Sequence, residues 1–142
     1  LRHTSAGAWD NAFINFNHTG WFAAPNYVVM KLWWDNFAPQ FLPVTGEQQG
    51  ANIVATRSED GNLVVLKAVN PENRALTVEV ELQGGFAPKT ASMQVVAPGS
   101  LNARNTLASP TAVHPRTGVV HLTEKRIRFD LPAHSTAVVR VN

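Results

Sequence analysis

The side chains that most often carry chemistry are few in this sequence and do not gather into a recognisable site. Cysteine is absent, which excludes thiolate nucleophiles, disulfides and cysteine-ligated zinc. Serine, histidine and aspartate occur without a Gly-x-Ser-x-Gly elbow, and no glycine-rich phosphate loop is present, so we expect no catalytic triad and no cofactor. No metal is expected either, because the histidines have neither one-turn helical spacing nor a carboxylate partner: they are His3, His18, His114, His121 and His134.

Two small charged groups are better explained by a solvated sheet than by a reaction or a nucleic acid. Glu79 and Glu81 alternate with valines, which places both carboxylates on the polar face of an amphipathic strand. Lys125, Arg126 and Arg128 form a basic cluster, but acidic residues flank it and the net charge of the chain is only +2. We therefore expect neither a catalytic carboxylate pair nor nucleic-acid binding.

The bulk composition fits one ordinary domain with a short appendage. At 142 residues, 44% of them hydrophobic, the chain can bury one core. No apolar run approaches the roughly 20 residues of a bilayer-spanning helix, and residues 1–5 lack the layout of a signal peptide. The chain begins without an initiator methionine, which favours an internal fragment, a trimmed chain or a proteolytic product. We expect no membrane partner and a soluble protein, cytoplasmic or secreted, of bacterial origin.

The first forty residues predict one strand and one unusually apolar helix. Residues 12–17 alternate as a short strand does, and residues 27–37 have helical character with a proline near each end. Within that helix only Lys31 and Asp35 are charged, so apolar side chains point in almost every direction. The rest of the chain could cover one side of such a helix at most. The pattern predicts a further protein body packed on Tyr27, Met30, Trp33 and Trp34.

From residue 52 onward the pattern is that of short strands separated by turn residues. An Asp-Gly pair at residues 60–61 favours a tight hairpin, and Gly84-Gly85 and Pro98-Gly99 separate later strands. Residues 100–116 read as a long irregular connection over the surface. Many short strands at this spacing predict a mainly β protein with an antiparallel, jelly-roll-like sandwich. The predicted strands are residues 52–58, 63–69, 76–82, 91–97, 119–123, 126–131 and 136–141.

Three segments together resemble the C-terminal region of α-L-arabinofuranosidases of glycoside hydrolase family 51. They are residues 18–40 (HTGWFAAPNYVVMKLWWDNFAPQ), 55–71 (ATRSEDGNLVVLKAVNP) and 95–106 (VVAPGSLNARNT). That family joins a catalytic (β/α)8 barrel to a jelly-roll sandwich and releases arabinofuranose from arabinan and arabinoxylan with retention; some relatives act on xylan or β-glucan. The resemblance implies that residues 1–40 are the last barrel strand and helix, and residues 41–142 the sandwich.

The resemblance also implies where the chemistry lies. Retaining hydrolysis needs two carboxyl groups about 5 Å apart, and in this family they are glutamates on earlier barrel strands, so we expect no catalytic residue here and no activity of this chain alone. Trp9 would border the sugar cleft. Asn15 and Asn17 would project toward the barrel axis near its active end, although short polar residues at a strand end also serve as turn partners.

Three functions remain open from the sequence. The first is an accessory domain that braces the missing barrel of a hemicellulose hydrolase and meets its polysaccharide substrate only through that parent. The second is a stand-alone carbohydrate-binding sandwich, although the adjacent Trp33 and Trp34 point about 100° apart on a helix and cannot form one flat platform. The third is an adhesive or protein-interaction sandwich. Retardation on polysaccharide gels would separate the second function from the first.

Overall fold

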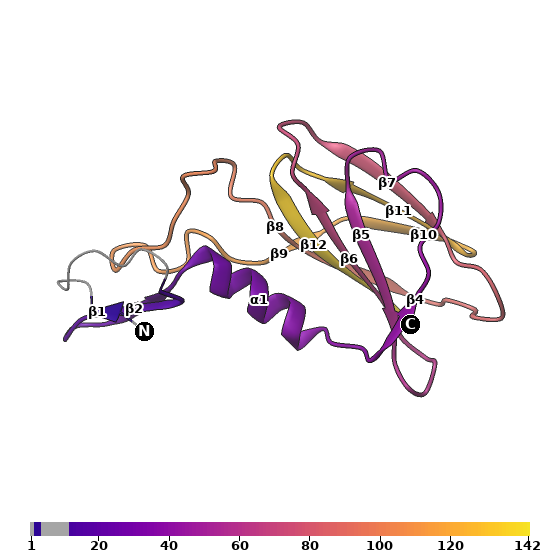
Figure 1. Cartoon of the computed structure of the whole chain (residues 1–142), viewed down its shortest axis with the longest axis horizontal. Helices are drawn as coiled ribbons and strands as arrows, with labels where there is room; N and C mark the ends of the chain where they lie inside the picture. Colours follow the sequence, from indigo (N-terminus) through magenta and orange to yellow (C-terminus); the bar gives the residue numbers. More distant parts are fainter. Residues whose placement is uncertain (1, 4–11) are drawn as a thin grey trace.

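The computed structural model describes residues 2–3 and 12–142, which form a β-sandwich with a helix and a small hairpin beside it (Figure 1). Each neighbouring pair of strands within the two sandwich sheets is antiparallel. The larger sheet has six strands in the order β4 (Gln40–Leu42), β5 (Asn52–Arg57), β6 (Val64–Asn70), β12 (Ser135–Val141), β8 (Ala91–Val96) and β9 (Arg116–Gly118). The smaller sheet has three, in the order β10 (Val120–Thr123), β11 (Arg126–Leu131) and β7 (Leu76–Glu81).

Alternation of apolar and polar residues explains why the two sheets face each other. Along β11 every second residue is buried, and Ile127, Phe129 and Leu131 are at most 1% exposed. These side chains meet Leu66 and Val139 of the larger sheet in the main core. Burying large apolar side chains in this way is the principal favourable term in the stability of the domain. The mainly β, antiparallel sandwich expected from the sequence is confirmed.

The helix α1 (Pro25–Asp35) covers the outer face of the six-stranded sheet. Its inward side contributes Leu32, which packs with Val65 and Val138 in a second, smaller core. Pro25 occupies the first helical turn, where the missing N–H costs nothing, so the helix begins two residues before the predicted start at residue 27. It also ends earlier, at Asp35, because Asn36 leaves helical geometry with φ −114° and ψ 40°.

A third, small sheet lies at the end of the molecule where the chain begins. It comprises β1 (Arg2–His3), β2 (Ile14–Phe16) and β3 (Trp21–Ala23), with β1 parallel to β2 and β2 antiparallel to β3. The predicted strand at residues 12–17 is therefore present but shorter. The second arm of its hairpin, β3, was not predicted because three residues carry too little periodicity to be recognised.

The long connection between β8 and β9 is not a loose surface loop. Figure 1 shows it running from the sandwich past α1 toward the hairpin. Asn105, 2% exposed, donates from Nδ2 to the carbonyls of Ala23 and Val113, and its Oδ1 accepts from the Val113 N–H. Val113 and Ala103 of the same segment join the core beneath the helix. This segment therefore ties β3 to the sandwich.

Candidate functional site

The outward side of α1 carries a group of exposed apolar side chains. Met30 is 55% exposed, Trp34 77% and Phe37, just past the end of the helix, 65%. The residue spacing of 30, 34 and 37 places them on one side of a helix. The Trp34 and Phe37 rings are 6.1 Å apart between centroids with planes at 27°. We call these three residues the outer helix face; its only charged neighbours on α1 are the exposed pair Lys31 and Asp35.

The ion pair beside the outer helix face is electrostatically satisfied. Lys31 Nζ lies 2.6 Å from Asp35 Oδ2, four residues along the helix. This hydrogen bond, together with the charge of the carboxylate, raises the pKa of Lys31. Both side chains are more than half exposed, so the pair adds little stability. The Lys31–Asp35 pair makes the border of the outer helix face polar, while the Trp34 and Phe37 rings stay exposed.

Trp33 belongs to the opposite side of the helix. Its Nε1 donates to Thr136 Oγ1 at 3.2 Å, and Lys67 Nζ lies 5.7 Å from the ring centroid while donating to the Trp33 carbonyl at 2.9 Å. Partial burial lowers the pKa of Lys67. The sandwich of this chain therefore engages part of the Trp33 side chain, and packing of a barrel on its remaining surface stays a prediction.

Two hydrogen bonds of Asn36 close the end of the helix and connect it to the sheet. Asn36, 6% exposed, donates from Nδ2 to the Leu32 carbonyl at 2.8 Å, and its Oδ1 accepts from Arg140 Nη1 at 3.1 Å. Tyr27, at the other end of the helix, is half-buried and lies 6.4 Å from the Phe13 ring. The outer helix face is therefore held in one orientation on a rigid support.

The residues proposed to meet a sugar are placed as follows. Trp9 lies outside the described residues. Asn17 is occupied by a turn, since its Oδ1 accepts from the Thr19 N–H at 2.8 Å, the Thr19 hydroxyl at 2.7 Å and the Gly20 N–H at 3.0 Å. Asn15 is half-buried, with Nδ2 3.5 Å from the Ala12 carbonyl. The structure brings Asn15 and Asn17 together on one hairpin, and it gives Asn17 a structural task.

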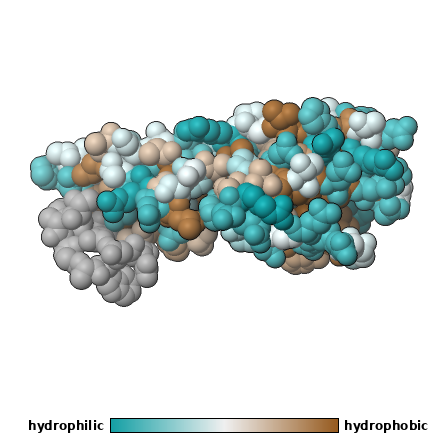
Figure 2. Space-filling model, turned by 90° about the horizontal axis from the view of Figure 1, so that it is seen from above, coloured by the Kyte–Doolittle hydropathy of each residue, from teal (hydrophilic) through white to brown (hydrophobic). Residues whose placement is uncertain are grey.

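Two acidic residues of the smaller sheet form cross-strand pairs. Glu79 lies 3.7 Å from Arg128 and Glu81 3.9 Å from Arg126, and all four side chains are more than half exposed. This is the solvated strand face expected from their alternation with valines. Hydrophilic residues cover much of the sandwich surface when the molecule is seen from above (Figure 2). Within the part of the chain that the structure describes, no group of three histidine or acidic side chains could hold a metal ion.

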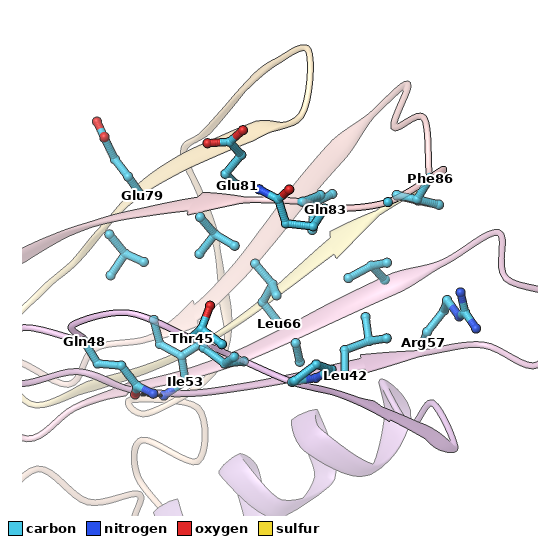
Figure 3. A pocket seen from close by; sticks show the side chains of 18 of the residues that line it. Leu42, Thr45, Gln48, Ile53, Arg57, Leu66, Glu79, Glu81, Gln83 and Phe86 are labelled. Carbon is cyan, nitrogen blue, oxygen red and sulfur yellow. Dashed lines mark hydrogen bonds between the residues drawn. The ribbon is translucent and has the colours of Figure 1, made fainter.

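Sequence reasoning missed a cleft between the two sheets. It has a volume of about 570 Å³ and follows β7 on the side away from β11. Ile53 and Leu66 of the larger sheet contribute to it, and Phe86 lies at one end (Figure 3). The signal that could have found it is strand count, because a six-stranded sheet faced by three strands leaves part of its inner surface uncovered.

Comparison with known protein families decides what kind of domain this is. The model of the α-L-arabinofuranosidase C-terminal domain matches residues 8–135. The chain belongs to this family. The resemblance to family 51 arabinofuranosidases drawn from the sequence is thereby confirmed. No match is found among curated proteins.

Solved structures agree with this family in fold. An arabinose-bound structure of the MgGH51 α-L-arabinofuranosidase is 23% identical, with a TM-score of 0.88 over 100% of this chain and 23% of its own. The thermostable GH51 enzyme of Thermotoga petrophila RKU-1 is 19% identical, with a TM-score of 0.82 over 91% of this chain and 31% of its own. This arabinofuranosidase C-terminal domain therefore spans between about a quarter and a third of these structures.

The same fold also accompanies another class of glycoside hydrolase. The catalytic domain of GH30 xylanase C from Talaromyces cellulolyticus is 17% identical, with a TM-score of 0.71 over 92% of this chain and 27% of its own. An arabinofuranosidase C-terminal domain thus shares its architecture with part of a xylanase. Architecture alone does not select a sugar. In the part of the chain that the structure describes, the helical segments fall short of the length and hydrophobicity of a transmembrane helix.

Proposed function

We propose that this arabinofuranosidase C-terminal domain is the accessory region of a larger retaining glycoside hydrolase acting on hemicellulose, and that it braces the catalytic barrel of that enzyme. The observation that carries the proposal is the outer helix face. Met30, Trp34 and Phe37 expose apolar side chains on a rigid helix, where contact with water is unfavourable. A barrel packed on this face would remove that cost.

The division of labour within the parent enzyme follows from the carboxylates. Glu79 and Glu81 are exposed and paired with arginines, so neither is in a low-dielectric setting that would tune it as an acid or a nucleophile. We assign the catalytic pair to the barrel, and residues 1–40 to the last barrel strand and helix. The parallel pairing of β1 with β2 supports this assignment, because neighbouring barrel strands are parallel.

The proposal predicts that the purified 142-residue chain has no hydrolytic activity. Assays with 4-nitrophenyl α-L-arabinofuranoside, arabinoxylan and β-glucan should all show background rates. Turnover by a homogeneous sample of this chain would contradict the proposal, because the described residues supply no suitable carboxylate pair.

Docking is tested in the complete hydrolase that this proposal implies. Replacing an exposed tryptophan by a charged residue is nearly harmless in water but costly in a packed interface. Trp34→Glu should therefore lower the melting temperature of the barrel, whereas the matched control Glu59→Lys, in the exposed β5–β6 turn, should not. Equal melting temperatures for wild type and Trp34→Glu would show that no barrel covers this face.

One observation favours a second function, a carbohydrate-binding module. The exposed Trp34 and Phe37 rings could stack on the apolar side of a sugar. Affinity electrophoresis on gels containing arabinoxylan or β-glucan separates the two functions. A bracing domain should migrate at the same rate with and without polysaccharide, whereas a binding module should be retarded, and Trp34→Ala should abolish that retardation.

A further inference from the structure

A second hollow lies at the end of the sandwich where the β5–β6 turn, the β7–β8 connection and the end of β12 meet. Its volume of about 670 Å³ is within the range of small-molecule sites. Figure 3 shows two of its lining residues, Arg57 and Phe86, at the same end of the cleft between the sheets. We call this site the basic hollow and define it by Arg57, Asn62, Phe86 and Lys89.

The charged side chains that line the basic hollow are both cations. Among the described residues, neither Arg57 nor Lys89 forms an ion pair with an acidic side chain. Arg57 donates from Nε and Nη2 to Gln40 Oε1 at 3.2 and 3.0 Å, so a neutral acceptor orients the guanidinium without cancelling its charge. Arg126 and Arg128, by contrast, face glutamates across the smaller sheet. Two uncompensated cations in one hollow favour an anionic ligand.

Hydrogen bonds hold the walls of the basic hollow in place. The N–H groups of Lys89 and Thr90 donate to the Asn142 carbonyl at 2.6 and 3.0 Å, which anchors the β7–β8 connection to the end of β12. On the opposite wall, the backbone N–H and Nδ2 of Asn62 each donate to the Asp60 carboxylate at 3.1 Å. These bonds leave Asn62 Oδ1 as an acceptor for a ligand. A site fixed in this way loses little entropy on binding.

The uncharged part of the basic hollow suits a sugar ring. Phe86 is half-buried, with one part packed against the main core and the rest available to the hollow. A Cβ added at Gly61 or Gly85, which also line the hollow, would meet no atom within 4 Å, so the space above both backbones is open. An aromatic surface beside a few polar groups is the usual composition of a small-molecule site.

We propose that the basic hollow binds a uronate residue of a polysaccharide, which is a sugar whose ring carries a carboxylate. The carboxylate would accept charge-assisted hydrogen bonds from Arg57 and Lys89. The apolar side of the ring would lie on Phe86, and a ring hydroxyl would donate to Asn62 Oδ1. The polysaccharide source of the ligand rests on the proposed function, whereas the chemistry of the ligand rests on the hollow alone.

Titration of the 142-residue chain with sodium glucuronate, followed by NMR at constant ionic strength, tests the ligand class. The backbone amide signals of Gly61, Asn62, Gly85 and Phe86 should shift and saturate. Glucose has the ring without the charge, and acetate and sulfate have a charge without the ring. Each of these three probes should bind at least about 10-fold more weakly than glucuronate, because each loses one part of the contact.

Two variants separate the contributions of charge and ring. Lys89→Gln changes an exposed side chain and should weaken glucuronate binding at least about 10-fold. The matched control Arg104→Gln removes the same charge outside the hollow, in the exposed β8–β9 connection, and should leave binding unchanged. Phe86→Leu keeps an apolar side chain but loses the aromatic face, so it should weaken glucuronate binding at least about 3-fold without changing acetate binding.

Affinity electrophoresis tests whether the uronate is recognised within a polymer. Gels containing glucuronoxylan should retard the chain, whereas gels containing the same polymer with its carboxyl groups reduced to alcohols should not. Lys89→Gln should be retarded less than Arg104→Gln, which has the same net charge. Equal migration in the two gels would refute a polysaccharide as the source of the ligand.

Three outcomes of the titration would overturn the inference. They are binding of glucose or sulfate as tight as that of glucuronate, signal changes that do not include the amides of the basic hollow, and equal glucuronate binding by Lys89→Gln and wild type. Trp34→Ala should leave glucuronate binding unchanged, because Trp34 lies outside the hollow. Failure of the docking proposal and failure of this inference therefore remain distinguishable.

Discussion

The two cores of this domain differ in how completely residues of the same chain enclose them. Between the sheets, Phe129 and Ile127 are almost fully enclosed by residues of the same chain. Around α1 only the inward side is enclosed, by Val65 and Val138, while Trp34 on the outward side remains 77% exposed. The first core explains why the sandwich can fold, and the second explains why its helix is suited to a larger assembly.

The largest effect on the free energy of unfolding should come from truncating a side chain in the core between the sheets. Phe129→Ala removes a ring that is 1% exposed and leaves a cavity, which should lower the free energy of unfolding by about 3–5 kcal/mol. Phe37→Ala, on the outer helix face, should change it by less than about 0.5 kcal/mol. Urea unfolding of both variants measures the contrast. Similar losses for the two would show that the outer face is already buried.

The next effect should come from the tie between the β8–β9 connection and the hairpin. Asn105→Ala leaves the carbonyls of Ala23 and Val113 and the Val113 N–H without their partner, at a cost of about 1–3 kcal/mol. Limited proteolysis should then cut faster around β3. The exposed Asn102→Ala is the matched control. Unchanged proteolysis in Asn105→Ala would mean that other contacts hold the hairpin.

Adjacent tryptophans provide a sharper comparison of the two sides of α1. Trp33→Phe loses the Nε1 hydrogen bond to Thr136 Oγ1 and should lower the free energy of unfolding by about 0.5–1.5 kcal/mol. Trp34→Phe has no such bond to lose and should be close to neutral. Thermal unfolding of the Trp33→Phe and Trp34→Phe variants measures this difference. A greater loss from Trp34→Phe would reverse our assignment of the helix faces.

The smallest effect should be a pH dependence in the β5–β6 turn. Hydrogen bonds from Ser58 and then Asn62 lower the pKa of Asp60 below its ordinary value. A carboxyl group with a lowered folded-state pKa stabilises the fold above its unfolded pKa and loses that contribution as the pH falls through the folded value. Asp60→Asn should therefore lose stability at neutral pH but converge with wild type in strong acid. Parallel stability curves would contradict this sign.

Sequence periodicity was sufficient for the longer elements and insufficient for features set by distant neighbours. The alternation of residues 126–131 correctly located β11, and the apolar helix was found within two residues at each end. The strands β3, β4 and β9 have three residues each, and their pairing depends on partners elsewhere in the chain. Likewise, no local pattern could show that Trp33 and Trp34 serve different neighbours.

For the candidate site, residue type predicted the surface but not its exact members. Counting apolar side chains on the helix indicated that one side would lack cover. It could not show that Trp33 also contacts Lys67 and Thr136, because these partners are remote in sequence. The cleft along β7 depends on how many strands each sheet contains, which is a property of topology. The proposed roles of Asn15 in sugar contact and of Trp9 at the cleft stay predictions.

The bond between Trp33 and Thr136 spans 103 positions along the chain, and it sets an order of events during synthesis. The helix emerges from the ribosome long before β12, the strand that it covers. Until β12 follows, the core beneath the helix lacks Val138, and the six-stranded sheet lacks the strand that joins β6 to β8. Folding of this domain is therefore governed by contacts between remote parts of the chain and should be slow compared with that of a helical protein of similar size.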